Sequence, residues 1–380
     1  MPALETLSPA SLLPFAIESG RGARLTDDQG RSYWDYYGGH AVALLGQGHP
    51  RWVEAISAQA RRLSFVTTIA PTSVRDRAID ALCTFARMDR AFLVNSGAEA
   101  NEAALKVARK ATGRSTVVAM ERGFHGRTMA CLGVTESGHY RADHAPVHAD
   151  ARFVPFGDLD ALAAAVDGDV AAVIIEPIQG IGGVHEAPQG FLEGARRICD
   201  ANGALLILDE VQTGIGRTGE AMAWHRAPGC RPDLVTVGKS LGNGFPVAAL
   251  LLTEAMADTT KPGEHGSTFG AAPLACAAIL AVLEAIDADD LLARARSIEA
   301  GIRAALEDLP GVVAIRGRGC LLGVVLDRPA RDVAAALLDA GLLVGGANDP
   351  LCLRLCPPAV LPFEAIDAFA TALSGALEAP

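Results

Sequence analysis

The stretch ALLILDEVQTGIGRTG, residues 204–219, decides the fold class of this chain. Five apolar residues lead directly into Asp209 and Glu210, and a glycine-rich loop follows them. An apolar run of this length is typical of a strand that is buried on both faces, as in a parallel sheet covered by helices. Ligands of open α/β sheets bind beyond the carboxyl ends of such strands, so Asp209 stands where a functional group is expected.

Six further runs of the same kind flank this stretch, at residues 91–94, 116–120, 152–154, 171–175, 234–237 and 247–252. Helix-length segments such as residues 98–112 and 190–202 lie between them. Strands that alternate with helices predict an α/β fold with a mostly parallel seven-stranded sheet. The last two runs are separated only by KSLGNGFP, which is too short for a crossover. We therefore expect these two strands to be antiparallel or not adjacent.

The remaining segments predict how the chain divides into domains. Residues 22–39 have the pattern of a hairpin that turns at residues 27–30. We expect residues 1–54 to pack on a smaller domain or on a dimer partner, residues 55–275 to form the large domain, and residues 276–380 to form a smaller α+β domain. The helices expected outside the central sheet are residues 51–63, 73–87, 273–286, 291–306 and 363–377.

Composition excludes several classes of function. The 380 residues carry a formal net charge of -11 and no block of basic residues, which argues against a nucleic-acid interface. The apolar runs are too short to span a bilayer, and the N-terminus lacks the basic segment of an export signal. Eight scattered cysteines without a CxxC pair predict reduced thiols in the cytoplasm. His139, His144 and His148 lack the spacing of metal ligands, so we expect no metal.

Lysine usage singles out one residue. The chain has only four lysines, and three of them have ordinary surface explanations, on a helix face (Lys106 and Lys110) or in a polar loop (Lys261). Lys239 instead follows the apolar run 234–237 directly. Since successive parallel strands end at the same edge of a sheet, Lys239 and Asp209 are expected to share that edge.

Two glycine-containing motifs have alternative explanations. Residues 214–219 match GxGxxG, but the segment that follows is short and contains Pro228, so a glycine-rich loop without a dinucleotide is favoured. A nicotinamide-dependent dehydrogenase remains the remote alternative. Residues 95–99, NSGAE, start a helix whose free N–H groups suit a phosphate. A capping box formed by Ser96 and Glu99 explains the same motif without a ligand.

Together, a helix start for a phosphate, an acid at one strand end and a lysine at the next are the parts of a pyridoxal phosphate site. With these residues, the chain resembles the class III, fold type I aminotransferases that use pyridoxal phosphate, and it is most similar to the acetylornithine and ornithine group. The similarity extends from about residue 22 to the end. Its motifs are NSGAEANEAALKVAR, GFHGRT, IIEPIQG, LILDEVQTGIGRTG, GKSLGNGFP, GSTFGAAPLACAA and LRLCPP.

The resemblance implies a role for each matching residue. Lys239 would hold the cofactor through a Schiff base, and Asp209 would bond its pyridine nitrogen. The other cofactor contacts implied are Ser96, Gly97 and Ala98 at the phosphate, Phe124 on the ring, Gln212 near the phenolic oxygen and Thr268 from the partner of a homodimer. Arg354 would bind the substrate α-carboxylate, and Arg127 and Ser267 would contact its distal part. We treat His125 as structural, and Cys352 and Cys356 as core thiols.

One position departs from the family. Related enzymes carry a glutamate where this chain has Ile181, in EPIQGIGG, and that glutamate pairs with the carboxylate-binding arginine. The expected reaction moves an amino group from an ω-amino donor, such as N-acetylornithine or ornithine, to 2-oxoglutarate, as in arginine biosynthesis. The alternatives within the class are a pyruvate-accepting ω-transaminase, an aminomutase and a decarboxylating enzyme.

Overall fold

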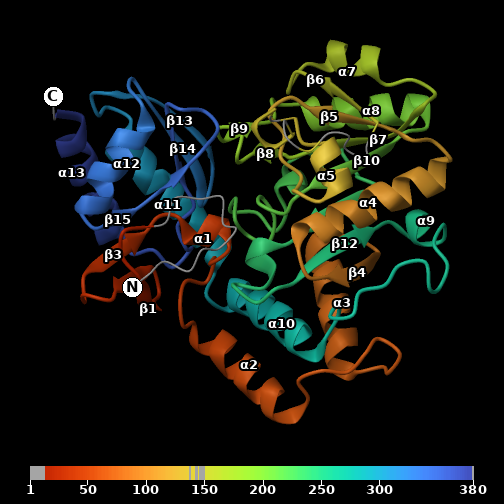
Figure 1. Ribbon diagram of the computed structural model, residues 1–380, viewed down its shortest axis with the longest axis horizontal. Coiled ribbons are helices and arrows are strands. Elements are labelled where there is room, and N and C mark those ends of the chain that lie inside the picture. Colours follow the sequence, from red (N-terminus) through yellow and green to blue (C-terminus); the bar gives the residue numbers. More distant parts are fainter. Residues whose placement is uncertain (1–12, 137, 142–143, 145–149, 379–380) are drawn as a thin grey trace.

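The computed structural model describes residues 13–136, 138–141, 144 and 150–378. A seven-stranded sheet forms its centre, with the strand order β4-β12-β11-β10-β7-β5-β6 (Figure 1). The strands are β4 (Arg90–Val94), β5 (Thr116–Met120), β6 (Ala151–Val154), β7 (Val170–Ile175), β10 (Leu205–Asp209), β11 (Leu234–Val237) and β12 (Ala248–Leu252). Only β12 runs antiparallel to its neighbours. The predicted mostly parallel sheet is confirmed, and the last two runs are adjacent and antiparallel.

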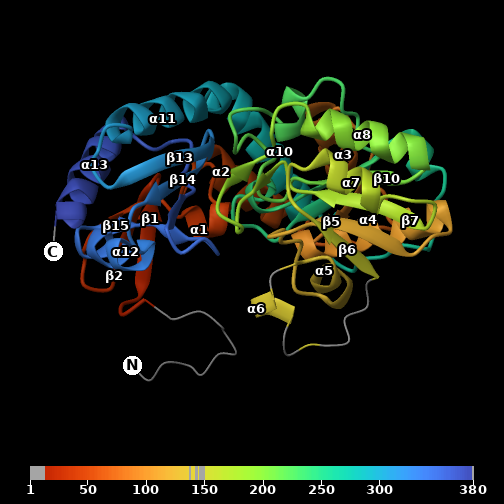
Figure 2. The same cartoon turned by 90° about the horizontal axis from the view of Figure 1, so that it is seen from above.

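Helices cover both faces of this sheet (Figure 2). On β7, Val173 and Ile175 belong to one buried cluster, whereas Ala172 and Ile174 belong to a second cluster with the apolar residues of α4 (Gly97–Thr112). The opposite face carries α8 (Phe191–Asn202), whose Phe191 belongs to the first cluster. Because successive strand residues point to opposite faces, burial on both faces requires the continuous apolar runs seen in the sequence.

The C-terminal part forms a second sheet with the order β13-β14-β17-β16. Its strands are β13 (Val312–Arg318), β14 (Leu321–Leu326), β16 (Gly345–Gly346) and β17 (Cys352–Leu355). The accompanying helices are α11 (Leu291–Leu306), α12 (Ala330–Asp339) and α13 (Phe363–Glu378). In Figure 1 this part lies beside the large sheet, at the end of the molecule that contains the C-terminus.

The N-terminal strands pack against this C-terminal part. They are β1 (Ile17–Arg21), β2 (Arg24–Asp27) and β3 (Ser32–Asp35), and β3 pairs in parallel with β15 (Leu342–Leu343). The Tyr36 hydroxyl donates to the Ala365 carbonyl at 2.8 Å, and its ring packs on Phe369. Residues more than 300 positions apart thereby form one hydrophobic core.

Helix α10 (Pro273–Ala288) crosses the expected domain boundary at 275/276. It packs against α2 (Pro50–Arg62) and α3 (Ser73–Ala86), below the large sheet in Figure 1. No helix in the described ranges is long and apolar enough to cross a membrane. The remaining short elements are α1 (Gly38–Ala41), α5 (Met129–Gly133), α6 (Gly138–Arg141), α7 (Leu159–Ala165), β8 (Ile178–Gln179), β9 (His185–Glu186), η1 (Ala223–Arg226), η2 (Lys239–Leu241) and α9 (Glu254–Ala257).

The glycine-rich loop at residues 214–219 has a structural task. Arg217 lies in it with no exposed surface, and its guanidinium donates to the carbonyl oxygens of Pro357 at 2.6 Å and Ala41 at 3.1 Å. The buried loop therefore connects the large sheet with the N-terminal and C-terminal segments. These contacts explain the GxGxxG pattern without a nucleotide.

Candidate active site

Asp209 and Lys239 lie at the same edge of the large sheet, as the sequence predicts. Asp209 is the last residue of β10 and is paired in register with Thr236 of β11, three residues before Lys239. Lys239 begins η2 with a φ of 44°, a left-handed conformation that is uncommon for a residue with a side chain. Backbone strain of this kind concentrates at functional sites, where the surroundings enforce it.

The Lys239 amine has no hydrogen-bond or ion-pair partner among the described residues. Burial lowers its pKa from the ordinary lysine value, and the positive charge of Arg354 lowers it further, against the opposing effect of Asp209. A lysine with a lowered pKa is more often neutral, and the neutral amine is the form that acts as a nucleophile or a base.

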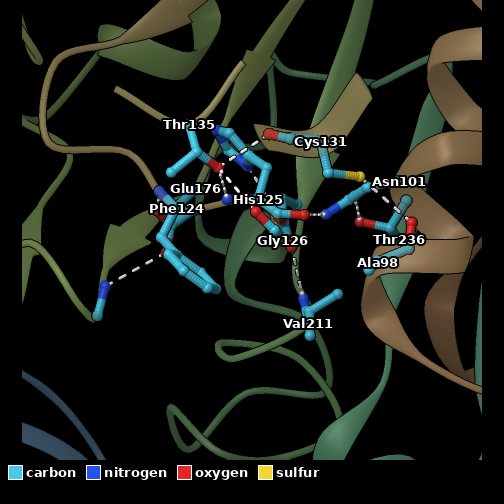
Figure 3. Close-up of polar contacts among 12 residues, drawn as sticks. Ala98, Asn101, Phe124, His125, Gly126, Cys131, Thr135, Glu176, Val211 and Thr236 are labelled. Carbon is cyan, nitrogen blue, oxygen red and sulfur yellow. Dashed lines mark hydrogen bonds and ion pairs between the residues drawn. The ribbon is translucent and has the colours of Figure 1, made fainter. Parts of the chain in front are cut away.

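A network of hydrogen bonds surrounds Asp209, and Figure 3 labels its partners Asn101, His125 and Val211. Its Oδ2 atom accepts from Asn101 Nδ2 at 2.8 Å and lies 2.8 Å from His125 Nδ1, and its Oδ1 atom accepts from the Val211 N–H at 3.0 Å. Thr236 donates to Asn101 Oδ1 at 2.7 Å and so orients the amide. Burial alone would raise the pKa of Asp209, but these donors lower it below its usual value, so the carboxylate is ionised at neutral pH.

His125, which the sequence predicts to be structural, lies against Asp209. It is buried against Asp209, and although burial lowers its pKa, the hydrogen bond to that carboxylate raises the pKa above its usual value. Its Nε2 atom is buried without a partner. The motif GFHGRT identified Phe124 and Arg127 but not this contact, because nothing in local sequence indicates which way the imidazole points.

The start of α4 combines both explanations that the sequence left open. Ser96 caps the helix through its Oγ atom, which accepts from the Glu99 N–H at 3.3 Å, and the Glu99 carboxylate accepts from the Asn95 N–H at 2.9 Å. The N–H groups of Gly97 and Ala98 have no acceptor within the described part of the chain. The helix start therefore has its cap and still has these two N–H groups free for an acceptor.

Glycine at position 97 brings this helix start close to the lysine. A Cβ atom on Gly97 would lie 2.6 Å from Val211 Cγ1, and one on Gly238 would lie 3.6 Å from the Gly97 nitrogen. The residue before Lys239 and the free N–H groups of α4 are thus neighbours. Lysine, carboxylate and anion cradle come from three different elements and meet at one edge of the sheet.

Arg354 and Gln212 form the opposite wall of the site. Arg354 lies in β17, is 2% exposed, and donates from Nη1 to Gln212 Oε1 at 3.0 Å, while its Nε atom is buried without a partner. It has no ion pair with any carboxylate of the described residues. A Cβ atom on Gly180 would lie 2.1 Å from Gln212 Oε1, so glycine at that position avoids a steric clash with the Gln212 side-chain amide.

Neither of the buried glutamates nearby pairs with Arg354. Glu176 accepts from the Phe124 N–H at 2.9 Å, and burial raises its pKa (Figure 3). Glu210 accepts from the Ala223 N–H at 2.9 Å and the Trp224 N–H at 2.7 Å. Both carboxylates are thus committed to backbone donors. Arg354 is a buried cation whose one protein partner in the described ranges is a neutral amide.

The other predicted residues lie at the margin of the site. Arg127 is exposed, with its guanidinium 4.6 Å from the centre of the Tyr140 ring. Ser267 accepts from Asn95 Nδ2 at 3.0 Å, which places it beside the start of α4. Thr268 is exposed, and Ile181 is half-buried with its carbonyl accepting from the Asn348 N–H at 2.8 Å.

Metal ligands and disulfides were also expected to be absent. The described residues contain no cluster of histidine, cysteine and acidic side chains that could hold a metal ion. Of the three histidines weighed for this role, His148 and the side chain of His139 lie outside the described residues. All eight cysteines, including Cys352 and Cys356 on either side of Arg354, are free and buried.

The chain matches one protein family over nearly its whole length. The family model described as "Aminotransferase class-III" matches residues 7–377. The chain is 45% identical over 369 residues to the acetylornithine aminotransferase of Mycolicibacterium smegmatis, covering 96% of this chain and 94% of that protein. It therefore belongs to the class III aminotransferases.

Solved structures lead to the same family. The ornithine aminotransferase of Toxoplasma gondii shares 32% of residues, with a TM-score of 0.92 over 97% of this chain and 92% of that one. The acetylornithine aminotransferase of Elizabethkingia anophelis shares 30%, with a TM-score of 0.86 over 97% and 95%. The predicted fold type I architecture is thereby confirmed. The chain is an enzyme, an aminotransferase that depends on pyridoxal phosphate.

The residues present fit this cofactor. An aldehyde needs an uncharged amine, which the lowered pKa of Lys239 favours. A protonated pyridine nitrogen needs an ionised acid, and the lowered pKa of Asp209 provides one. A phosphate needs donors, and the unpaired N–H groups of Gly97 and Ala98 supply them. A second structure of the Toxoplasma gondii enzyme, 33% identical to this chain, contains the cofactor at partial occupancy in its active site.

Proposed function

We propose that the enzyme transfers the ω-amino group of N-acetylornithine or ornithine to 2-oxoglutarate. The observation that carries this proposal is the place of Arg354, a buried cation without a carboxylate partner among the described residues, near enough to Lys239 for its charge to lower the pKa of that lysine. A buried charge without a partner is costly, so the site favours substrates that bring a carboxylate to it. Both the donors named and 2-oxoglutarate carry one.

The cofactor would be held from three sides. We assign Lys239 as its covalent anchor and Asp209 as the partner of its pyridine nitrogen. Ser96, Gly97 and Ala98 would bind the phosphate, Phe124 would lie against the ring, and Gln212 would approach the phenolic oxygen. The capped start of α4 supports the phosphate assignment, and the hydrogen bonds at Asp209 support the nitrogen assignment.

The protein's own contribution to the reaction is proton transfer and electrostatics. Pyridoxal phosphate, when bound, withdraws electrons from the substrate carbon that carries the reacting nitrogen. Lys239 would take the proton from that carbon and return it at the end of the half-reaction, which its lowered pKa favours. Asp209 would keep its negative charge throughout, since its donors lower its pKa.

The substrate would be bound at its two ends by different residues. Arg354 would bind the carboxylate next to the α-carbon, as a guanidinium does best when it is desolvated. Arg127 and Ser267 would contact the distal part. The exposed Arg127 side chain and the position of Ser267 beside Asn95 are compatible with this arrangement.

A transaminase for simple amines is the second candidate. An amine transaminase from an uncultivated Pseudomonas species shares 28% of residues with this chain, with a TM-score of 0.89 over 98% of both chains. Simple amines carry no carboxylate and would leave Arg354 buried and uncompensated during the first half-reaction. We therefore favour amino-acid donors.

We further propose a homodimer in which Thr268 reaches the partner's cofactor. Thr268 is exposed, and next to it Phe269 is 63% exposed and packs on Phe65, with ring centroids 5.7 Å apart. Ile69, in the same region, is 92% exposed. Apolar side chains gathered beside a site residue are typical of a surface that another subunit covers. Light scattering of the protein with and without Thr268→Ala, together with cofactor retention, tests this proposal.

We also propose that the enzyme works in the cytoplasm. All eight cysteines are unpaired and buried, as expected for a reducing compartment.

The main experiment measures the donor and the acceptor directly. The purified protein is scanned for visible absorbance, reduced with borohydride and then digested to locate the modified lysine. Donors are compared by the 2-oxoglutarate-dependent formation of glutamate, with N-acetylornithine, ornithine, γ-aminobutyrate and a simple alkylamine. The proposal predicts the first two to be the best. A better rate with the alkylamine, or with pyruvate as acceptor, would favour the second candidate.

A further inference from the structure

The short element α1 is a turn of left-handed helix beside the proposed substrate site. Gly38, Gly39, His40 and Ala41 all have φ values between 57° and 67°. Glycine adopts this conformation without cost, but His40 and Ala41 carry side chains that disfavour it. Strain of this kind persists only where the surrounding structure enforces it, and it concentrates at functional sites.

Contacts at both ends fasten the turn to the site. At its start, Asp35 Oδ1 accepts from the Gly38 N–H at 2.7 Å. At its end, the Ala41 carbonyl accepts from Ser240 Oγ at 3.2 Å and from Arg217 Nη2 at 3.1 Å. Ser240 directly follows Lys239, so the end of the turn is bonded to the segment that carries the reactive amine.

The turn also contacts the strand that carries Arg354. A Cβ atom on Gly38 would lie 2.4 Å from the carbonyl oxygen of Cys356, two residues beyond Arg354. The Tyr37 ring lies over Gly345, whose Cβ position is 2.7 Å from Tyr37 Cδ2, and Gly345 pairs with Arg354 between β16 and β17. The backbone of the turn is therefore placed between the two main functional residues.

His40 follows the two glycines of this turn, and the charges of the site residues act on its imidazole. His40 is exposed, and its imidazole contacts the Tyr37 hydroxyl, with the ring centroids 4.6 Å apart. Partial burial lowers its pKa, and the positive charges of Arg354, Lys239 and Arg127 lower it further, so the imidazole is neutral at neutral pH. No carboxylate of the described residues is among the groups that shift it.

We propose that His40 is a specificity-determining residue that hydrogen-bonds the neutral amide of an N-acylated donor, and that the cations around it disfavour a free diamino acid. This inference rests on the proposed function, and it names the class of donor. The Tyr37 hydroxyl occupies one ring nitrogen of His40, and the other nitrogen of the neutral imidazole is left to bond one polar group of an amide, its carbonyl or its N–H. The second ammonium of a free diamino acid would meet the guanidinium groups of Arg354 and Arg127, whose charges both act on His40.

A purely structural role does not account for a histidine at this position. Glycine would fit the left-handed turn without strain, and the exposed imidazole contributes little to the core. The turn is held instead by backbone contacts of Gly38 and Ala41, which remain when the imidazole is removed.

The test compares His40→Gly, His40→Asn and His40→Glu with the native holoenzyme. We measure kcat/KM for N-acetylornithine and for ornithine, the binding of N-acetylornithine to protein without cofactor by calorimetry, and the melting temperature. In His40→Gly, the ratio of N-acetylornithine to ornithine should fall about tenfold, as expected for the loss of one hydrogen bond. Its melting temperature should not fall, since the change relieves strain.

The other two His40 variants test the direction in which the preference between the two donors changes. Asparagine tolerates the left-handed conformation and keeps a donor and an acceptor, so His40→Asn should retain most of the preference for the amide. His40→Glu places a carboxylate among the cations and should shift the preference toward ornithine. Ala41→Gly is the matched control, because it relaxes the same turn without removing the imidazole, and its ratio should remain native.

Two outcomes overturn the inference. One is an unchanged ratio of the two donors in both His40→Gly and His40→Glu while the native enzyme transaminates. The other is an equal fall in His40→Gly and Ala41→Gly, which would assign the effect to the backbone. A native enzyme that transaminates neither donor contradicts the proposed function itself, and this result is distinct from both.

Discussion

Asp209 and Arg354 are both buried and charged, but the protein treats them in opposite ways. Asp209 receives hydrogen bonds from Asn101 and the Val211 N–H and lies in hydrogen-bond contact with His125, and its pKa is lowered accordingly. Among the described residues, Arg354 has one neutral partner, Gln212, and a guanidinium nitrogen that is buried without any. The first group has its hydrogen bonds within the protein, whereas we propose that the second is completed by a ligand that supplies an anion.

This difference separates the two tasks of the site. A group that must hold the same charge through every step is best fixed in advance by dipoles around it. A group that must bind two different substrates in turn is best left without a charged partner from the protein, because a carboxylate of the protein would compete with each substrate. Lys239 lies between the two, with a pKa that responds to both charges.

Removing Lys239 should have the largest effect, because it takes away the amine that we assign as the anchor of the cofactor. Lys239→Ala is expected to fold but to lose turnover and all cofactor that borohydride can trap. Circular dichroism, activity and peptide mapping check this expectation. Lys261→Ala, a loop variant, is the matched control and should behave as the native enzyme. Reduced cofactor on any other lysine would refute the assignment.

Asp209→Ala tests the buried carboxylate whose hydrogen bonds the protein itself supplies. We expect it to retain cofactor but to lose about a thousandfold in kcat, the scale of removing a preorganised electrostatic group. Single-turnover absorbance changes measure this rate. Glu210→Gln is the control, since Glu210 binds backbone N–H groups and its replacement should lower the melting temperature rather than the rate. Near-native turnover in Asp209→Ala would mean that another group supports the cofactor nitrogen.

Arg354→Gln tests the buried cation that has only a neutral partner among the described residues. For donors with a carboxylate, kcat/KM should fall about a hundredfold, because a desolvated charge pair with the substrate is lost. A simple alkylamine, which has no carboxylate, should be affected little. Arg318→Gln, on the same C-terminal sheet but paired with Glu186, serves as the control. An equal loss for the alkylamine would show that Arg354 supports the structure of the site instead of the substrate.

Ile181→Glu should have the smallest effect. It would offer Arg354 a charged partner within the protein, which Arg354 now lacks among the described residues. If the new carboxylate pairs with Arg354, glutamate must displace it, so the rate with N-acetylornithine should rise several-fold relative to that with glutamate. Single-turnover rates with both donors give this ratio, and Ile181→Gln controls for size. An unmoved ratio would indicate that Gln212 already does what the missing glutamate does in related enzymes.

Much of the site followed from local patterns. The apolar runs placed the strands, and the strand ends placed Asp209 and Lys239 on one edge, because parallel strands end on the same side of a sheet. Other features had no local signal. His125 lies 84 positions from Asp209, and Arg354 lies 142 positions from Gln212, so periodicity and spacing could not pair them.

The sequence by itself determined the fold class, the seven strands of the large sheet, the placement of Lys239 and Asp209 at one edge of it, and the capped start of α4. Each of these depends on neighbours within one element, where side-chain direction follows from chain geometry. Only the tertiary structure decided which buried charges are paired, that Arg354 has a neutral partner, and that His40 occupies a left-handed turn beside it. Those outcomes depend on packing between distant segments, which fixes side-chain direction and burial together.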